Sequence, residues 1–294
     1  MRIGVTGASG LLGTALVPAL RGAGHAVTRI GRGPDSDVRW NPAAGQMDAA
    51  ACEGIDAFVH LAGANIGQRW TSGHRREIRD SRVAGTTLIA RTAAAMAPQP
   101  RVLVSASAVG IYGNAADAVC DESAPAGHDY LAEVCQAWES GADAARTAGI
   151  RTVHLRFGVL LSRHGGALGK MLPVFRLGAG GRVGDGRQWM SWLSMDDAVA
   201  IVRFALDSEA LSGAVNATAP SPVTNTEFTA TLARVVHRPA LFPVPALALN
   251  LAFGEMAQAT LLASQRVVPR RLLSAGYVFR HATLEPALRA AVNE

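Results

Sequence analysis

The first thirteen residues, MRIGVTGASGLLG, constrain the fold more than any other stretch of this 294-residue chain. Apolar residues alternate with smaller ones up to Val5, as in a short buried strand, and an apolar run with helical spacing begins at Leu11. The glycines Gly7, Gly10 and Gly13 join these two stretches at three-residue spacing. A strand, a glycine turn and a helix in this order predict a turn that binds a dinucleotide.

The physical basis of this prediction is the free N-terminus of the helix. It presents unpaired N–H groups and a partial positive charge, so a diphosphate binds there when no side chain intervenes. We expect the first glycine to allow the tight turn, the second to admit the phosphates, and the third to let helix and strand pack closely. A glycine-rich turn of another α/β protein is the alternative. The predicted contacts in this turn are Gly7, Ser9, Gly10, Leu11, Leu12 and Gly13.

The end of the second predicted strand, 26–30, bears on which dinucleotide binds. Arg32 follows Gly31 at the position where an acidic residue would bind the ribose 2′-hydroxyl, and an arginine there accommodates a 2′-phosphate. Asp35 and Asp37 come later, after a Gly-Pro pair, and are expected in a loop. We therefore predict NADP(H) in preference to NAD(H), with Gly31 and Arg32 among its contacts. The alternative is that Arg32 is a solvated loop arginine.

Alternating strands and helices predict the fold class. Strands are expected at 38–40, 56–61, 101–105 and 152–157, and helices at 74–96 and 130–147. Near-continuous apolar strands are typical of a parallel sheet that is covered on both faces. We predict an α/β fold: a Rossmann-type doubly wound parallel sheet over residues 1–160 and a smaller mixed C-terminal substrate lobe over 161–294. A segment near 190–217 is expected to return to the sheet, with the substrate in the cleft between the two parts.

Further positions follow from this arrangement. Small residues after the strand 56–61 would lie at the carboxyl edge of the sheet, where ligands bind. Ser194 is predicted to cap a helix over 198–206. The apolar stretch 245–253 is too short to cross a bilayer and is predicted to be a buried core helix. The cofactor contacts expected at the carboxyl edge are His60 (mainly through its backbone), Leu61, Ala62, Gly63 and Ser105.

Composition limits the class of protein. A chain with 49% hydrophobic and 17% charged residues is globular. The net charge of +5 is not gathered in a basic run, so no nucleic-acid partner is expected. Cys52, Cys120 and Cys135 are odd in number and lack CxxC spacing, so we expect no disulfide framework, no metal site and a reducing cytoplasm. No signal peptide and no membrane-spanning segment are expected.

Several motifs resemble the extended short-chain dehydrogenase/reductase superfamily. Besides the glycine turn, these are Leu61-Ala62-Gly63, Ser105-Ala106-Ser107 with Tyr112-Gly113, and Arg82-Val83-Ala84-Gly85-Thr86. More closely, the chain resembles an atypical epimerase-like subfamily with a DUF1731-type C-terminal segment, through CQAWE at 135–139, GGRVGDGRQ at 180–188 and VVPRRLL at 267–273. The resemblance spans essentially the whole chain. It implies an NADP(H)-dependent oxidoreductase or epimerase for a small carbonyl or hydroxyl compound, with nucleotide sugars as the substrates of relatives, and a possible homodimer.

The resemblance fails at the superfamily's catalytic pair. There, a tyrosine assisted by a lysine four residues later exchanges a proton with the substrate oxygen while hydride moves at carbon, because a free tyrosine forms little phenolate at neutral pH. Lys170 is the only lysine of this chain, and Gly166 stands four residues before it. Matching Glu139 to the glutamate that ends the motif puts Leu131 and Cys135 at the tyrosine and lysine positions.

Other residues are candidates for the missing roles. Ser107 matches the catalytic hydroxyl if one residue is inserted before Tyr112; otherwise it is a strand-end serine that satisfies backbone groups. Tyr130, one residue out of register, is a proton donor or a surface or core tyrosine. Cys135 is a thiol facing the nicotinamide or a buried small hydrophobe. Arg82, where relatives carry asparagine, is predicted to bind the cofactor or clamp an anionic substrate, with a solvated helix face as the alternative. A catalytically inactive NADP(H)-binding sensor or interaction protein is the second functional hypothesis.

Overall fold

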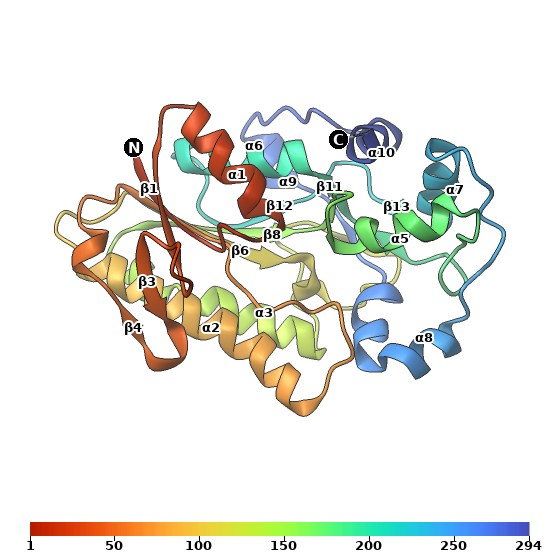
Figure 1. Cartoon of the computed structure of the whole chain (residues 1–294), viewed down its shortest axis with the longest axis horizontal. Coiled ribbons are helices and arrows are strands. Elements are labelled where there is room, and N and C mark those ends of the chain that lie inside the picture. The colour runs from red at the N-terminus through yellow and green to blue at the C-terminus, as the bar shows by residue number, and fades with distance from the viewer. Residues whose placement is uncertain (294) are drawn as a thin grey trace.

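A computed structural model describes residues 1–293, and within them an eight-stranded sheet occupies the centre of the molecule (Figure 1). Its strands are β1 (Arg2–Thr6), β2 (Ala26–Gly31), β3 (Val38–Asn41), β4 (Gln46–Met47), β5 (Ala57–His60), β6 (Val102–Ala108), β8 (Arg151–Phe157) and β12 (Gly213–Ala217). The order across the sheet is β12-β8-β6-β5-β1-β2-β3-β4. Every pairing is parallel except that of β4, which runs antiparallel to β3 at one edge.

Helices cover both faces of this sheet (Figure 1). One face carries α1 (Leu11–Gly22), α6 (Met195–Asp207) and α9 (Arg270–Ser274), and the other carries α2 (Ser72–Ala95), α3 (Tyr130–Ser140) and α4 (Asp143–Thr147). Each face has its own apolar core, with Leu16 and Ile201 buried on the first and Phe58 and Ile89 on the second. The doubly wound α/β fold predicted from the alternating pattern is therefore confirmed.

The remaining elements form a lobe beside the sheet (Figure 1). Its helices are α5 (Gly166–Arg176), α7 (Asn225–Val235), α8 (Ala246–Phe253) and α10 (Leu284–Asn293). A short π-helical turn (Ala257–Leu261) follows α8. Its short strand pairs are β9 (Val159–Leu161) with β11 (Trp192–Ser194), β10 (Trp189–Met190) with β13 (Val223–Thr224), and β7 (Val119–Cys120) with β14 (Arg266–Val267). A separate core that contains Trp192, Phe228 and Leu288 holds much of this lobe together. The chain returns from the lobe to the main sheet through α6 and β12.

The single helix predicted over 130–147 is wrong, because the structure has two helices there. The chain leaves α3 at Gly141 and begins α4 at Asp143. A Cβ added at Gly141 would lie 3.1 Å from the Cβ of Thr86 in α2. The interruption therefore lies where the chain packs closely against α2, a contact that helical periodicity does not reveal.

The prediction of a buried core helix over 245–253 is also wrong. The helix α8 exists, but Leu249 is its only buried residue, whereas Leu247 and Leu251 are 70% and 72% exposed. Its apolar residues surround the helix, so their pattern does not say which side is covered. No helix within residues 1–293 has the length and hydrophobicity needed to cross a membrane.

Ser194 caps a helix as predicted, although α6 starts directly after it. The Ser194 hydroxyl accepts a hydrogen bond from the backbone N–H of Asp197 at 3.0 Å. This cap satisfies one of the free N–H groups of the first turn. It also fixes Asp197 at the start of α6, where the segment 277–281 contacts this helix.

Candidate functional site

The glycine turn between β1 and α1 has the close contacts that its spacing predicts. Gly7 has a φ of +67°, and a Cβ added there would lie 2.8 Å from the carbonyl carbon of Leu61. A Cβ at Gly13 would clash with the carbonyl oxygen of Gly7. The backbone N–H of Gly10 donates to that same oxygen at 2.9 Å. Side chains at positions 7 and 13 would therefore push the turn away from the sheet.

Gly10 has a different role from the other two glycines. It is exposed and precedes α1 without capping the helix through a side chain. A Cβ placed on it would meet only the oxygen of Gly7 within 4 Å, so its outer side is open. The N–H groups of the first turn of α1 thus face a space large enough for an anion, which fits a dinucleotide diphosphate.

A cleft of about 850 Å³ lies in front of this turn. It is lined by the turn, by the end of β2 and by the loop that follows β5. The predicted cofactor residues that line it are Gly7, Ser9, Gly10, Gly31, Arg32, Leu61, Ala62 and Gly63. Leu11 lines a second cavity instead, and Leu12, Gly13, His60, Arg82 and Ser105 do not line the cleft. The cleft also has lining residues that the motifs did not indicate: Thr14, Arg21, Trp40, Asn41, Asp80 and Ser81.

The basic end of β2 has one arginine in an ion pair and one without. The Asp37 carboxylate accepts from the backbone N–H of Arg29 at 2.7 Å and from its Nε at 3.4 Å. These contacts, the backbone hydrogen bond foremost, hold the pKa of Asp37 below its usual value. Arg32 is exposed at the rim of the cleft and has no ion pair within residues 1–293.

His60 is the last residue of β5 and is buried beside the loop that lines the cleft. Its side chain is fully buried, and its Nδ1 lies 2.7 Å from the hydroxyl oxygen of Thr6 on the neighbouring strand. The same oxygen accepts the backbone N–H of Leu61 at 3.2 Å, which fixes the start of the loop that follows β5. Burial, together with the nearby charge of Arg82, lowers the pKa of His60 to about 3. The imidazole is therefore neutral at physiological pH.

Arg82 lies between α2 and the loop after β5. A Cβ added at Gly63 would lie 3.2 Å from its Cζ, and the guanidinium lies 4.9 Å from the ring centre of Trp138. Its Nη1 donates to the carbonyl of Ile78 at 3.1 Å, and no carboxylate within residues 1–293 pairs with it. Burial lowers the pKa of Arg82. A half-buried guanidinium without a carboxylate beside the loop is suited to an anionic ligand.

Ser107 belongs to a buried polar network that crosses from β6 to α3. Its hydroxyl donates to Oε1 of Glu139 at 2.7 Å. The same carboxylate accepts both the Nε and the Nη2 of Arg156, at 2.8 and 2.9 Å. In the registers of the sheet, Ser107 and Asn216 are both partners of Arg156, so the three side chains share one face.

The network continues to Tyr112, which sequence reasoning treated only as part of a motif. The Tyr112 hydroxyl accepts from Nη1 of Arg156 at 3.0 Å and donates to Oδ1 of Asn216 at 2.7 Å. Burial raises the pKa of this phenol despite the adjacent guanidinium. The strand registers are the signal that joins these residues, but they become available only when the strand order is known.

The other two candidates for proton transfer are a tyrosine whose hydroxyl is hydrogen-bonded to the backbone and a buried cysteine. Tyr130 donates its hydroxyl hydrogen to the backbone carbonyl of Arg75 in α2, and burial raises the pKa of this phenol. Cys135 is buried, and burial foremost, with the negative charge of Glu139, raises the pKa of its thiol to about 12. The Cys135 thiol is therefore protonated at physiological pH. The catalytic roles of Ser107, Tyr130 and Cys135 stay predictions.

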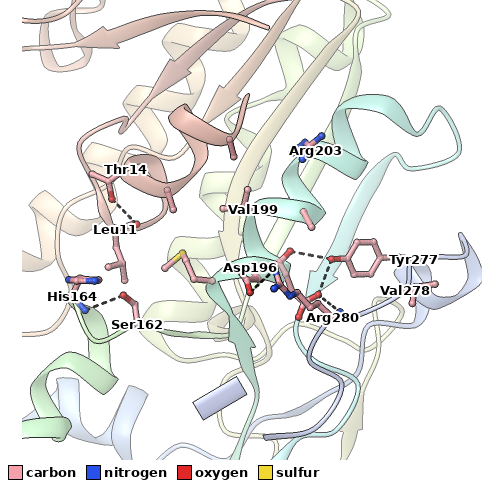
Figure 2. Close-up of a pocket in the computed structure, with 15 residues that line it drawn as sticks. Leu11, Thr14, Ser162, His164, Asp196, Val199, Arg203, Tyr277, Val278 and Arg280 are labelled. Carbon is pink, nitrogen blue, oxygen red and sulfur yellow. Dashed lines mark hydrogen bonds and ion pairs between the residues drawn. The ribbon is translucent and has the colours of Figure 1, made fainter. Parts of the chain in front are cut away.

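A second cavity of about 560 Å³ lies between α1 and the start of α6 (Figure 2). Beside it, the fully buried Asp197 accepts from the backbone N–H of Arg280 at 2.8 Å and from the hydroxyl of Tyr277 at 3.1 Å. Figure 2 shows Tyr277 and Arg280 directed towards the start of α6, where Arg280 also pairs with Asp196 at 3.2 Å. Asp197 thus fastens the C-terminal segment to α6. Within residues 1–293, no group of His, Cys, Asp or Glu side chains is arranged to hold a metal ion.

The comparison with family models decides the family. Residues 3–217 match the NAD dependent epimerase/dehydratase family, and residues 244–291 match a domain of unknown function, DUF1731. The chain belongs to the NAD dependent epimerase/dehydratase family. The resemblance inferred from the motifs is thereby confirmed, including its C-terminal segment.

Relatives within this family match the chain end to end. The epimerase family protein MT2273 of Mycobacterium tuberculosis is 44% identical, over 99% of this chain and 97% of its own length. The human epimerase family protein SDR39U1 is 37% identical over 99% of this chain and all of its own length.

Solved structures extend the comparison to three dimensions. The crystal structure of human SDR39U1 (isoform 2) with NADPH superposes with a TM-score of 0.91 at 35% identity and covers 100% of both chains. MoeE5 in complex with UDP-glucuronic acid and NAD shares the fold, with a TM-score of 0.79 at 21% identity, and covers 100% of this chain and 98% of its own.

Proposed function

We propose that this chain is an NADP(H)-binding, epimerase-like oxidoreductase for a small carbonyl or hydroxyl compound that works without a tyrosine–lysine pair. The observation that carries the proposal is the cleft of about 850 Å³ in front of the glycine turn, with the exposed Arg32 at its rim. The human relative, SDR39U1, was crystallised with NADPH. Family membership supports the same class of cofactor.

The preference for NADP(H) over NAD(H) rests on charge at the end of β2. Asp37 is occupied by Arg29, so its carboxylate is not free to accept a ribose hydroxyl. Arg32 is free to donate to a 2′-phosphate. The N–H groups that begin α1 beyond Gly10 would hold the diphosphate.

The chain's own residues would bind and orient the cofactor. The reaction would also need a side chain that exchanges a proton with the substrate oxygen. When bound, NADP(H) donates or accepts a hydride at its nicotinamide ring. Arg82, beside Gly63, is placed to neutralise an anionic group of cofactor or substrate. Ser107, Tyr130 and Cys135 remain the candidates for the proton at the substrate oxygen. Family membership suggests a nucleotide sugar as the substrate class. That the chain forms a homodimer and that it is located in the cytoplasm remain predictions.

A second function is favoured by the state of these three candidates. The Ser107 hydroxyl is donated to Glu139, the Tyr130 hydroxyl to a backbone carbonyl, and the Cys135 thiol is buried and protonated. If none of these three groups can exchange a proton with a substrate, the chain would bind NADP(H) without oxidising or reducing it. It would then act as a catalytically inactive sensor or interaction protein.

Calorimetry with NADPH and NADH on the wild type and on Arg32→Ala tests the cofactor assignment. We expect Arg32→Ala to weaken NADPH binding about tenfold and to leave NADH binding unchanged, because only NADPH carries the 2′-phosphate. Arg91→Ala, which removes an exposed arginine from α2 outside the cleft, is the matched control. Equal NADPH affinity in wild type and Arg32→Ala would refute the assignment.

Turnover separates the two functions. The absorbance of NADPH is followed in the presence of a panel of carbonyl compounds that includes nucleotide sugars with a keto group. Oxidation of NADPH by any of them supports the oxidoreductase. Tight NADPH binding without oxidation across the panel favours the sensor, and absence of binding to either dinucleotide refutes both.

A further inference from the structure

One side of the lobe exposes a group of large apolar side chains, here called the α8 surface. They come from the end of α5, from the segment before α8 and from α8 itself. Their exposed fractions are high for their residue types: Val174 46%, Leu177 83%, Leu241 74%, Phe242 61%, Val244 36%, Leu247 70% and Leu251 72%.

Backbone contacts join the segment after α5 to the segment before α8. The N–H of Phe242 donates to the carbonyl of Gly180 at 3.1 Å, and the N–H of Gly184 donates to that of Val244 at 2.9 Å. Leu247 and Leu251 are one helical turn apart, so they lie on the same face of α8. Figure 1 shows α8 at the periphery of the lobe, away from the central sheet. Contiguous exposed apolar patches are rare in proteins that have no partner there.

The charges around the α8 surface are mostly positive, although the exposed Asp185 and Glu255 lie next to it in the sequence. The two segments that form it, residues 170–182 and 236–254, contain no aspartate or glutamate. They contain Lys170, Arg176, Arg182 and Arg238, none of which forms an ion pair within residues 1–293. The guanidinium of Arg238 donates only to backbone carbonyls, those of Arg176 and His237. The basic side chains of these two segments therefore outnumber the two acidic side chains that lie next to them.

We propose that the α8 surface binds the face of an anionic lipid bilayer. Exposed Leu247, Leu251 and Phe242 supply apolar side chains for the acyl boundary, while Arg176 and Arg182 meet lipid phosphates. A second copy of this chain fits less well, because a two-fold contact would bring the arginine rims of both copies together. The eight residues of α8 are too few to span the bilayer, so the chain would lie on its surface. This inference does not depend on the identity of the cofactor.

Co-sedimentation of the full chain with vesicles tests the apolar part of the proposal. The vesicles consist of phosphatidylcholine alone or of phosphatidylcholine mixed with phosphatidylglycerol. We expect binding to the mixed vesicles and a loss of more than about tenfold in the double variant Leu247→Glu/Leu251→Glu, because charged groups do not enter the acyl boundary. Val278→Glu is the matched control, since Val278 is 86% exposed and outside the α8 surface.

A second pair of variants tests the arginines. Arg176→Gln/Arg182→Gln should weaken binding to the mixed vesicles about 25-fold, at about fivefold for each arginine lost. Arg91→Gln/Arg203→Gln removes the same charge from α2 and α6 and should have little effect. Circular dichroism confirms that each variant is folded, which is expected because all these side chains are exposed.

Three results would overturn the proposal. The first is absence of binding to either type of vesicle. The second is equal binding to both, since the arginines would then play no part. The third is a concentration-dependent dimer, seen by light scattering, that Leu247→Glu/Leu251→Glu dissociates, because the α8 surface would then be an interface between two copies of the chain.

Discussion

Removal of the Glu139 carboxylate should strongly destabilise the fold. Glu139 joins α3 to the sheet through the bidentate pair with Arg156 and the hydrogen bond from Ser107. The side chains of Glu139 and Arg156 are only 15% and 10% exposed. In Glu139→Ala the guanidinium would stay buried, with the Tyr112 hydroxyl as its remaining side-chain acceptor.

The expected magnitude follows from this burial. Breaking a buried ion pair by removing one partner costs about 3–5 kcal/mol, because the other charge is left without compensation. Glu139→Gln keeps the shape and one acceptor, so it should cost less, about 2 kcal/mol. The double variant Glu139→Leu/Arg156→Met should cost less than Glu139→Ala alone, because it leaves no unpaired charge.

Urea denaturation at neutral pH, followed by tryptophan fluorescence, measures these free energies of unfolding. Burial opposes ionisation of Glu139, but the hydrogen bonds and charge of Arg156 outweigh it and lower the pKa below the usual 4.5. Since the folded-state pKa is lowered, the stabilisation is complete above the unfolded-state pKa and is lost as the pH falls through the folded-state value. The difference between wild type and Glu139→Ala should therefore shrink below about pH 4.5. A cost under about 1 kcal/mol at neutral pH, or one that does not change in acid, would refute this account.

Two further predictions concern the glycine turn and the cysteines. Gly13→Ala should abolish measurable NADPH binding in calorimetry and lower Tm, because the new Cβ clashes with the carbonyl oxygen of Gly7; wild-type affinity would contradict the role given to Gly13. Cys52, Cys120 and Cys135 are buried, and burial raises the pKa of each thiol, so a thiol-specific reagent at neutral pH should label the native chain far more slowly than the chain unfolded in urea. Rapid labelling of Cys135 in the native chain, tested against Cys135→Ser, would show that its thiol is accessible and reopen its role as a nucleophile.

The N-terminal half of the site could be predicted because its signals are local. Glycine at positions 10 and 13 reflects contacts within one turn and one helix that are close in sequence, and glycine at position 7, although it packs against Leu61, is indicated by the same three-residue spacing. The alternation of apolar strands and helices likewise reflects which segments are covered on both faces, and this yields a parallel sheet. The position of Arg32 at the rim follows from the same local reasoning, because it comes directly after β2.

The polar network and the exposed helix could not be predicted, because they depend on which distant segments meet. Glu139, Arg156 and Asn216 are far apart in sequence and come together only through the order β12-β8-β6 and the packing of α3. Hydrophobicity alone suggested that α8 is buried, but the lobe covers only Leu249.

Sequence periodicity and glycine spacing thus determined the α/β fold class and the turn between β1 and α1, since both depend on the conformation and burial of short segments. Tertiary structure alone decided which polar groups are paired, as for Glu139 with Arg156, and which apolar groups are left exposed, as for Leu247. The physical reason is that pairing and exposure are properties of two surfaces in contact. A single segment encodes its own preference but not the identity of the surface that it meets.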